Sequence, residues 1–288
     1  MQSGFSTSQR FWFPILHYFG WAYAISWLIW APYYMDLGVS RNDLPYVHLL
    51  GSLGPLLASV AMTLYQRGRP GIRQFWGRAT GWLAVRWLAI GAFSPVVVLL
   101  GVISSIFLTH QQVPHWPTMP GSGEFASFSP WAFVLANLLF FGFGEEVGWR
   151  GYVLPRLQVR YSAFTSNLIL TAFWAIWHWP LFFNPLGGYA HMDLGAVIGW
   201  VVSLVTGGIL FTWLFNTSRG NVVACALFHG SMDLVFTADL GQPVVSSYTG
   251  ILVTLWGIAI WFFYGRATLS PSGKVTLPSP EQPVAAEA

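Results

Sequence analysis

The stretch WAFVLANLLFFGFGEEVGWRGY, residues 131–152, is an apolar run that ends in two adjacent carboxylates, Glu145 and Glu146, followed by Arg150. No charged residue precedes Glu145 in this stretch. The rest of the chain must therefore indicate whether these carboxylates lie in water, in a protein core or in a lipid bilayer.

The composition indicates a membrane protein. The chain has 288 residues, of which 55% are hydrophobic and only 8% are charged, whereas a soluble domain carries about 25% charged residues. Its 17 tryptophans suit anchoring at a membrane interface. Nucleic-acid binding would need a clustered basic face with accessible aromatic side chains, and the sequence shows none. The single cysteine, Cys225, excludes an intrachain disulfide.

Eight apolar runs are predicted to be transmembrane helices, since most have the ~20 residues that a helix needs to cross the hydrocarbon core. We therefore expect an all-α, polytopic membrane protein with about eight transmembrane helices. The GxxxG spacings of Gly144/Gly148 and Gly195/Gly199 predict close helix packing. The runs are 11–35, 45–65, 82–108, 129–149, 163–183, 194–215, 221–238 and 247–265.

The positions of Lys and Arg predict the orientation. Loop 66–81 holds four arginines and loop 109–128 holds none. With loop 66–81 in the cytoplasm, twelve of the 13 Lys and Arg residues lie on that side and only Arg41 lies outside, as the positive-inside rule requires. This arrangement predicts cytoplasmic N and C termini. We expect one transmembrane domain, residues 1–266, and a disordered cytoplasmic tail, residues 267–288, because the tail is rich in Pro, Ser and Ala.

Few ionisable residues fall well inside the apolar runs, and each is a functional candidate because such groups are costly in a membrane. Glu146 and Arg150 are four residues apart, so they can pair on one helical face, whereas Glu145 is turned by about 100° from Glu146. We predict that Glu146 is a structural partner of Arg150 that stays out of the site, and that Glu145 faces the bundle interior. The candidates are Glu145, Glu146, Asp233, His17, His178 and His229.

Three motifs follow one another within residues 145–233. They are EExxxR at Glu145–Arg150, a variant of FxxxH with Trp174 and His178, and HxxxD at His229 and Asp233. In this order, the motifs resemble those of the CPBP intramembrane proteases, which include the Rce1-like type II CAAX prenyl endopeptidases and the bacterial Abi proteins. The resemblance covers roughly residues 129–238.

This resemblance implies an endopeptidase that cleaves a membrane-anchored protein or peptide, with prenylated CAAX-type proteins as one substrate class. It implies that Glu145 and His178 activate a water, while His229 and residue 233 stabilise the oxyanion. Glu146 and Arg150 would hold the helix end. The family has Asn or Asp at the last position. Because an ionised Asp cannot donate a hydrogen bond, Asp233 must be protonated, orient His229 or contact a metal.

Two features of the expected site stay open in the sequence. Glu145, His178 and His229 would form a three-ligand Zn²⁺ site with a position for water, which we slightly favour, but they could also act without metal. Glu145 lies near the cytoplasmic end of its run, whereas His178 lies ~22 Å into the next helix at 1.5 Å per residue. We therefore expect an amphipathic segment at 150–162 that takes up this offset, and a cavity open to the cytoplasm.

Two other functions fit the same pattern of buried polar residues. One is a non-enzymatic membrane scaffold or bacteriocin-immunity protein of the same fold. The other is a proton-coupled transporter, which the lack of a repeat between the two halves of the chain disfavours. The expected location is the plasma membrane of a prokaryote.

Overall fold

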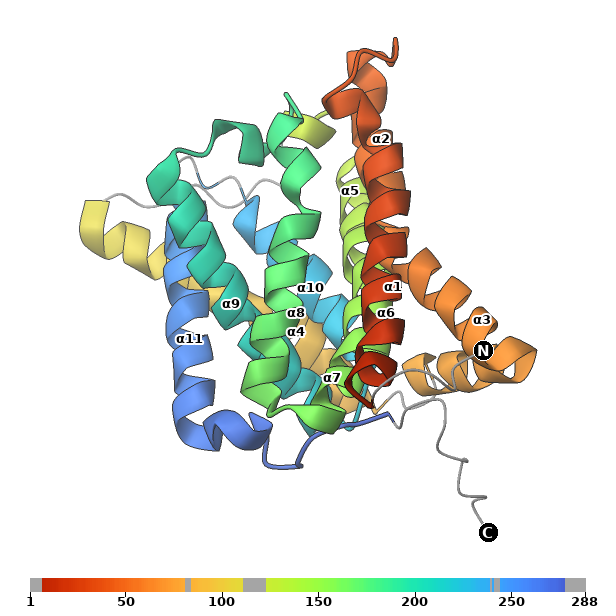
Figure 1. Cartoon of the computed structure of the whole chain (residues 1–288). Helices are drawn as coiled ribbons and strands as arrows, with labels where there is room; N and C mark the ends of the chain where they lie inside the picture. The colour runs from red at the N-terminus through yellow and green to blue at the C-terminus, as the bar shows by residue number, and fades with distance from the viewer. Residues whose placement is uncertain (1–6, 81–83, 111–122, 239, 241–243, 278–288) are drawn as a thin grey trace.

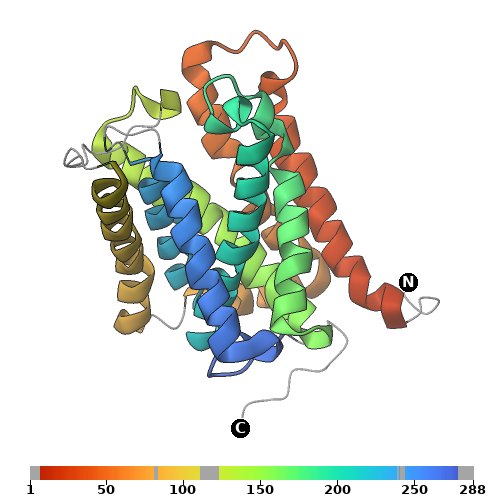
Figure 2. The ribbon, with the colours of Figure 1, turned by 90° about the vertical axis from the view of Figure 1, so that its left-hand side faces the viewer.

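A computed structural model describes residues 7–80, 84–110, 123–238, 240 and 244–277, and these residues form a helical bundle without strands (Figures 1 and 2). The predicted all-α class is confirmed. The α-helices are α1 (Thr7–Ile29), α2 (Leu44–Gly51), α3 (Gly54–Thr80), α4 (Val85–His110), α5 (Pro130–Ala136), α6 (Gly144–Gly148), α7 (Leu154–Arg160), α8 (Ala163–Trp177), α9 (Leu194–Thr217), α10 (Val222–Phe236) and α11 (Val245–Thr268).

Short π-helical and 3₁₀ segments connect or interrupt these helices. The segments η4 (Asn137–Phe143) and η5 (Trp149–Val153) are π-helical and lie on either side of α6. Such turns are rare and often occur at functional sites. The 3₁₀ segments are η1 (Ala31–Tyr33), η2 (Arg41–Asp43), η3 (Gly123–Phe125), η6 (Trp179–Phe183) and η7 (Gly188–His191).

Several helical stretches are long and apolar enough to cross a membrane. Among the described residues there are five, and α10 is a shorter apolar helix. The chain is thus a multi-span membrane protein, whereas the count of eight spans and the cytoplasmic placement of both termini stay predictions. The five stretches are Arg41–Thr80, Val85–Thr109, Pro130–Arg160, Leu194–Thr217 and Val245–Thr268.

The helix that carries the two glutamates is longer than the sequence predicts. Helical turns continue from Pro130 to Arg160, so the apolar run does not end near residue 149. The segment expected to be amphipathic, 150–162, is instead mostly buried, including Arg150 with 0% exposure. The reason is that Arg150 pairs with Glu146, which allows its charge to remain inside the bundle.

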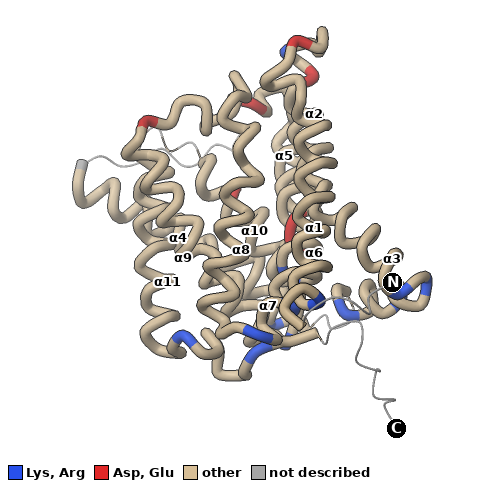
Figure 3. Tube along the Cα trace, viewed as in Figure 1, with Lys and Arg blue, Asp and Glu red and all other residues tan. Residues whose placement is uncertain are grey.

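The loop predicted at 66–81 is also helical. Helix α3 continues to Thr80 but breaks direction at Gly68, whose φ of 59° favours glycine. Lys and Arg gather at the end of the bundle that includes this segment, which we call the basic end (Figure 3). Asp and Glu occur at the opposite end, which we call the acidic end, and in the middle of the bundle (Figure 3). Helix α1 begins and α11 ends at the basic end (Figures 1 and 2).

One of the two GxxxG pairs makes close helix contacts. A Cβ added to Gly148 would lie 2.6 Å from the carbonyl oxygen of Pro55, and one added to Gly144 would lie 3.2 Å from that of Ser52. The predicted close approach is confirmed for this pair. A Cβ on Gly199 would meet no atom within 4 Å, so the prediction for Gly195/Gly199 is wrong.

The first part of the predicted tail makes specific contacts. The Gln158 side chain donates to the carbonyl of Val275 at 2.8 Å, and Lys274 donates to that of Tyr161 at 2.9 Å. Leu269 is fully buried. Residues 278–288 of the predicted tail lie outside the described residues.

Candidate active site

A helix hairpin places Glu145 and His178 at the same height. Tyr161 and Ser162 form the turn between α7 and α8, and the Ser162 side chain caps α8 by accepting from the backbone N–H of Thr165. Glu145 lies 16 residues before Tyr161, and His178 lies 16 residues after Ser162. Because both arms rise by about 1.5 Å per residue, the helix offset expected from the sequence disappears.

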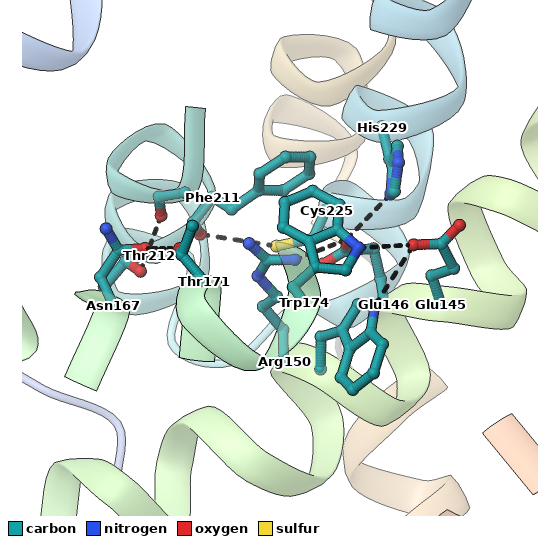
Figure 4. Close-up of polar contacts among 12 residues, drawn as sticks. Glu145, Glu146, Arg150, Asn167, Thr171, Trp174, Phe211, Thr212, Cys225 and His229 are labelled. Atoms are coloured by element: carbon teal, nitrogen blue, oxygen red, sulfur yellow. Dashed lines mark hydrogen bonds and ion pairs between the residues drawn. The ribbon is translucent and has the colours of Figure 1, made fainter. Parts of the chain in front are cut away.

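The carboxylate of Glu145 is held by two indoles. Its Oε2 accepts from Trp149 Nε1 at 3.2 Å and from Trp174 Nε1 at 2.9 Å, and Glu145 is 4% exposed (Figure 4). Trp174 replaces the phenylalanine of the FxxxH motif, and only the indole can donate this hydrogen bond. No ion pair of Glu145 occurs among the described residues.

Glu146 connects a buried arginine to a histidine. Its Oε1 accepts from Arg150 Nη1 at 2.7 Å and lies 2.9 Å from His229 Nδ1 (Figure 4). The pair with Arg150 was predicted, but the expectation that Glu146 would stay out of the site is wrong. The Arg150 guanidinium also lies 4.2 Å from the centroid of the Phe211 ring, so a cation–π contact adds to its stabilisation.

Close packing of two helices brings His229 to this carboxylate. Helix α10 lies against η4, and a Cβ added to Gly230 would lie 2.7 Å from the Asn137 carbonyl oxygen. Gly142 faces the backbone of Ala226 at a similarly close approach. Since side chains at these two positions would separate the helices, the glycines are what allows the contact between Glu146 and His229.

Asp233 lies on the other side of the His229 ring. Its Oδ2 is 3.7 Å from His229 Nε2, which is too long for a direct hydrogen bond. The Asp233 side chain is 31% exposed, against 9% for His229. The orientation of His229 therefore comes from Glu146.

His178 caps the end of α8 next to these residues. Its Nδ1 lies 2.7 Å from the carbonyl oxygen of Trp174. Because a carbonyl only accepts, Nδ1 carries the proton and Nε2 is left with a free lone pair. The Trp174 ring packs against both imidazoles, with its centroid 5.6 Å from that of His178 and 5.6 Å from that of His229.

Two further aromatic residues that the sequence did not single out enclose His178. The ring centroids of Tyr189 and Trp200 lie 5.7 Å and 5.6 Å from that of His178. Burial raises the pKa of the Tyr189 phenol above its ordinary value, so this group is protonated at neutral pH. Tyr189 lies between α8 and α9 in η7, outside any motif, and no spacing in the sequence relates it to His178.

A second buried polar cluster lies on the side of the acidic end. Glu124 Oε1 is 2.8 Å from His48 Nδ1 and accepts from Asn184 Nδ2 at 2.7 Å. The His48 ring packs on Phe141 with a centroid distance of 4.9 Å, one helical turn before Glu145. In the sequence, His48 lies near the start of the run 45–65 and Glu124 lies in the loop 109–128. Their separation of 76 residues gives no signal of the contact.

The predicted zinc ligands do not form a ready metal site. Among the described residues, no group of three or more His, Cys, Asp and Glu side chains is arranged to hold a metal ion. Oε2 of Glu145 already accepts two indole hydrogens, and the Trp174 ring packs against both histidines. The arrangement does not fit a three-ligand zinc, and we assign no chemical step to a metal.

Comparison with known proteins agrees with the three motifs. Residues 127–235 match the family model described as type II CAAX prenyl endopeptidase Rce1-like. This segment is thus similar to the Rce1-like endopeptidases. The CAAX prenyl protease 2 of Methanococcus maripaludis is 31% identical to the chain over 146 residues, which cover 49% of this chain and 51% of that protein. The chain thus spans about half of the relative's length, and the segment that matches the family model includes Glu145, His178 and His229.

Proposed function

We propose that this protein is an intramembrane endopeptidase that hydrolyses a peptide bond of a membrane-associated substrate, with Glu145 and His178 as the pair that activates water. The observation that carries the proposal is the contrast between two adjacent glutamates. Within the part of the chain that the structure describes, Glu146 is paired with Arg150 and His229, whereas Glu145 accepts hydrogen bonds from two indole N–H groups and forms no ion pair. Glu145 therefore keeps a carboxylate oxygen, Oε1, that can accept a proton.

In the proposed reaction, the water lies between Glu145 Oε1 and His178 Nε2. The two groups orient the water, and one of them takes a proton as the water oxygen attacks the scissile carbonyl carbon. The fixed tautomer of His178, with Nδ1–H donating to the Trp174 carbonyl, leaves Nε2 as an acceptor. The proton then passes to the leaving amine when the C–N bond breaks.

His229 and Asp233 are proposed to stabilise the oxyanion. The His229 ring lies between the Glu146 carboxylate, at 2.9 Å from Nδ1, and the Asp233 carboxyl group, at 3.7 Å from Nε2. The Glu146 carboxylate stabilises a doubly protonated ring, whose Nε2–H can donate to the oxyanion. A protonated Asp233 donates to the same oxygen, which takes the place of the hydrogen bond that Asn provides in related motifs. Preorganised donors of this kind contribute about 3–4 kcal/mol each in hydrolases.

The substrate class is a membrane-anchored protein or peptide. The relative's name, CAAX prenyl protease 2, makes prenylated CAAX-type proteins one candidate within this class. The test is cleavage of membrane-anchored peptides by the purified protein in proteoliposomes, with Glu145→Gln as the matched control. Cleavage by the wild type alone supports the proposal, and equal cleavage by both proteins overturns it.

A further inference from the structure

We infer that Tyr189 is a further catalytic residue, whose phenol O–H donates a hydrogen bond to the oxyanion formed on the scissile carbonyl. Tyr189 belongs to η7, in the segment that connects α8 to α9 (Figure 1), and lies outside the three sequence motifs. This role rests on the proposed function, because an oxyanion forms only if the site hydrolyses a carbonyl substrate. Tyr189 would add a neutral donor to those proposed at His229 and Asp233.

The phenol of Tyr189 is close to the reacting groups of the proposed site. Its ring centroid lies 5.7 Å from that of His178, the histidine proposed to orient the water. Among the charged groups around the phenol, the carboxyl groups of Asp233 and Glu145 act on it most strongly, and Asp233 acts more strongly than Glu145. The phenol is therefore near both the carboxylate proposed to activate water and the carboxyl group proposed to hold the oxyanion.

The hydroxyl hydrogen of Tyr189 has no acceptor within the described part of the chain. The Trp200 indole, with its ring centroid 5.7 Å from that of Tyr189, can only donate through its N–H. In contrast, the hydroxyl of Tyr23 donates to the backbone carbonyl of Phe173 at 2.6 Å. The O–H of Tyr189 is thus left for a group that the protein itself does not supply.

Exposure distinguishes Tyr189 from the other tyrosines whose hydroxyls lack a partner. The hydroxyls of Tyr18 and Tyr152 also make no hydrogen bond among the described residues, but both residues are fully buried. Tyr189 is only partly buried, so a ligand can reach its hydroxyl. Simple packing of an aromatic ring would need neither the hydroxyl nor this access.

The phenol of Tyr189 is neutral at neutral pH. Burial, together with the neighbouring carboxyl groups of Asp233 and Glu145, raises the pKa of Tyr189 above its ordinary value, so the hydroxyl keeps its proton. A neutral O–H can donate to an oxyanion without placing a second negative charge beside it. Such a donor stabilises the transition state more than the substrate, because the negative charge on the carbonyl oxygen develops only during the reaction.

The segment between α8 and α9 holds Tyr189 in place. Before Tyr189, the buried Asn184 donates through Nδ2 to Glu124 Oε1 at 2.7 Å. After it, Asp193 caps α9 with a hydrogen bond of 2.7 Å. The ring of Phe182 packs on that of Tyr189, with centroids 5.5 Å apart. A donor fixed in this way is preorganised, which is the condition for effective stabilisation of an oxyanion.

Tyr189→Phe tests this role because it removes the hydroxyl and keeps the ring. The ring contacts with His178, Phe182 and Trp200 need no hydroxyl. Both proteins are reconstituted in proteoliposomes, and kcat and KM are measured with a membrane-anchored peptide that the wild type cleaves. Because loss of one oxyanion donor lowers kcat by about 100- to 1,000-fold in hydrolases, we expect kcat to fall by about 100-fold with KM unchanged.

Tyr23→Phe is the matched control, since it removes the hydroxyl of another partly buried tyrosine. That hydroxyl donates to a backbone carbonyl, so its loss should lower Tm and leave kcat unchanged. Tyr189→Phe should show the opposite pattern, a lower kcat at the Tm of the wild type. If Tyr189→Phe lowered Tm as much as Tyr23→Phe does, its hydroxyl would have a structural partner and the inference would be overturned.

A second measurement separates stabilisation of the oxyanion from substrate binding. In an inhibitor based on the same peptide, a phosphinate replaces the scissile amide and presents a tetrahedral anion to the site. Since such analogues report transition-state stabilisation, Tyr189→Phe should weaken phosphinate binding by the same factor by which kcat/KM falls. Equal kcat or equal phosphinate binding in the two proteins would overturn the role of Tyr189. Failure of the wild type to cleave any membrane-anchored peptide would instead contradict the proposed function itself, and this role with it.

Discussion

Replacing Glu146 by glutamine should lower the free energy of unfolding of the protein more than the same replacement at Glu145. Arg150 is fully buried, and its Nε and Nη2 have no hydrogen-bond partner among the described residues. Glu146→Gln removes the carboxylate 2.7 Å from Arg150. Breaking a buried pair in this way costs about 3–5 kcal/mol, because an uncompensated charge is left behind.

Glu145→Gln is the matched control at the adjacent position. The indoles of Trp149 and Trp174 can donate to an amide oxygen as they do to the carboxylate, and no arginine loses its partner. We expect a change in the free energy of unfolding of at most about 1 kcal/mol. The measurement is thermal unfolding in nanodiscs, followed by tryptophan fluorescence, with peptide cleavage measured on the same samples.

For a chain of this size, 1 kcal/mol shifts Tm by about 2–4 °C, so Glu146→Gln should lower Tm by on the order of 10 °C. Glu145→Gln should leave Tm within a few degrees of the wild type and abolish cleavage. The roles of the two acids would be the reverse of those assigned if Glu146→Gln were as stable as the wild type but inactive while Glu145→Gln kept its activity.

Three further predictions concern Trp174, Asp233 and the effect of metal chelators. Trp174→Phe keeps the ring but removes a hydrogen bond to the Glu145 carboxylate worth about 1.5–3 kcal/mol, so kcat should fall by roughly 10-fold or more; an unchanged kcat would show that this bond has no role. Asp233→Asn should retain much of the activity, because the amide donates as the protonated acid does, whereas Asp233→Ala should lose most of it; wild-type turnover by the Ala variant would reduce position 233 to packing. Because Glu145 and the two histidines form no three-ligand site, EDTA or 1,10-phenanthroline should leave cleavage unchanged, and a loss that added Zn²⁺ reverses would restore the zinc hypothesis.

Much of the fold can be predicted from the sequence because its strongest signals are local. Low charge and long apolar runs predict membrane helices, and each of the eight runs contains helical residues in the structure. The end of the fourth run was misplaced, since Arg150 resembles a membrane boundary in sequence. Its pairing with Glu146 over one helical turn keeps the charge inside, and hydropathy does not account for such pairing.

The site itself could be predicted only in part. Spacing of four residues predicts the contact between Glu146 and Arg150, but the contact between Glu146 and His229 joins positions 83 residues apart. That contact depends on close packing at Gly142 and Gly230, which no pattern in the sequence indicates. The indole donors to Glu145 were missed for a similar reason, because one of them, Trp174, comes from a different helix.

The most direct test of the central claim is a single comparison of cleavage by wild type and by Glu145→Gln. Both proteins are reconstituted in proteoliposomes at equal, verified folded amounts, and release of product from a membrane-anchored peptide library is followed by mass spectrometry. We predict discrete cleavage products with the wild type and none with Glu145→Gln. The same products at the same rate with Glu145→Gln would contradict the assignment of Glu145 as the carboxylate that activates water.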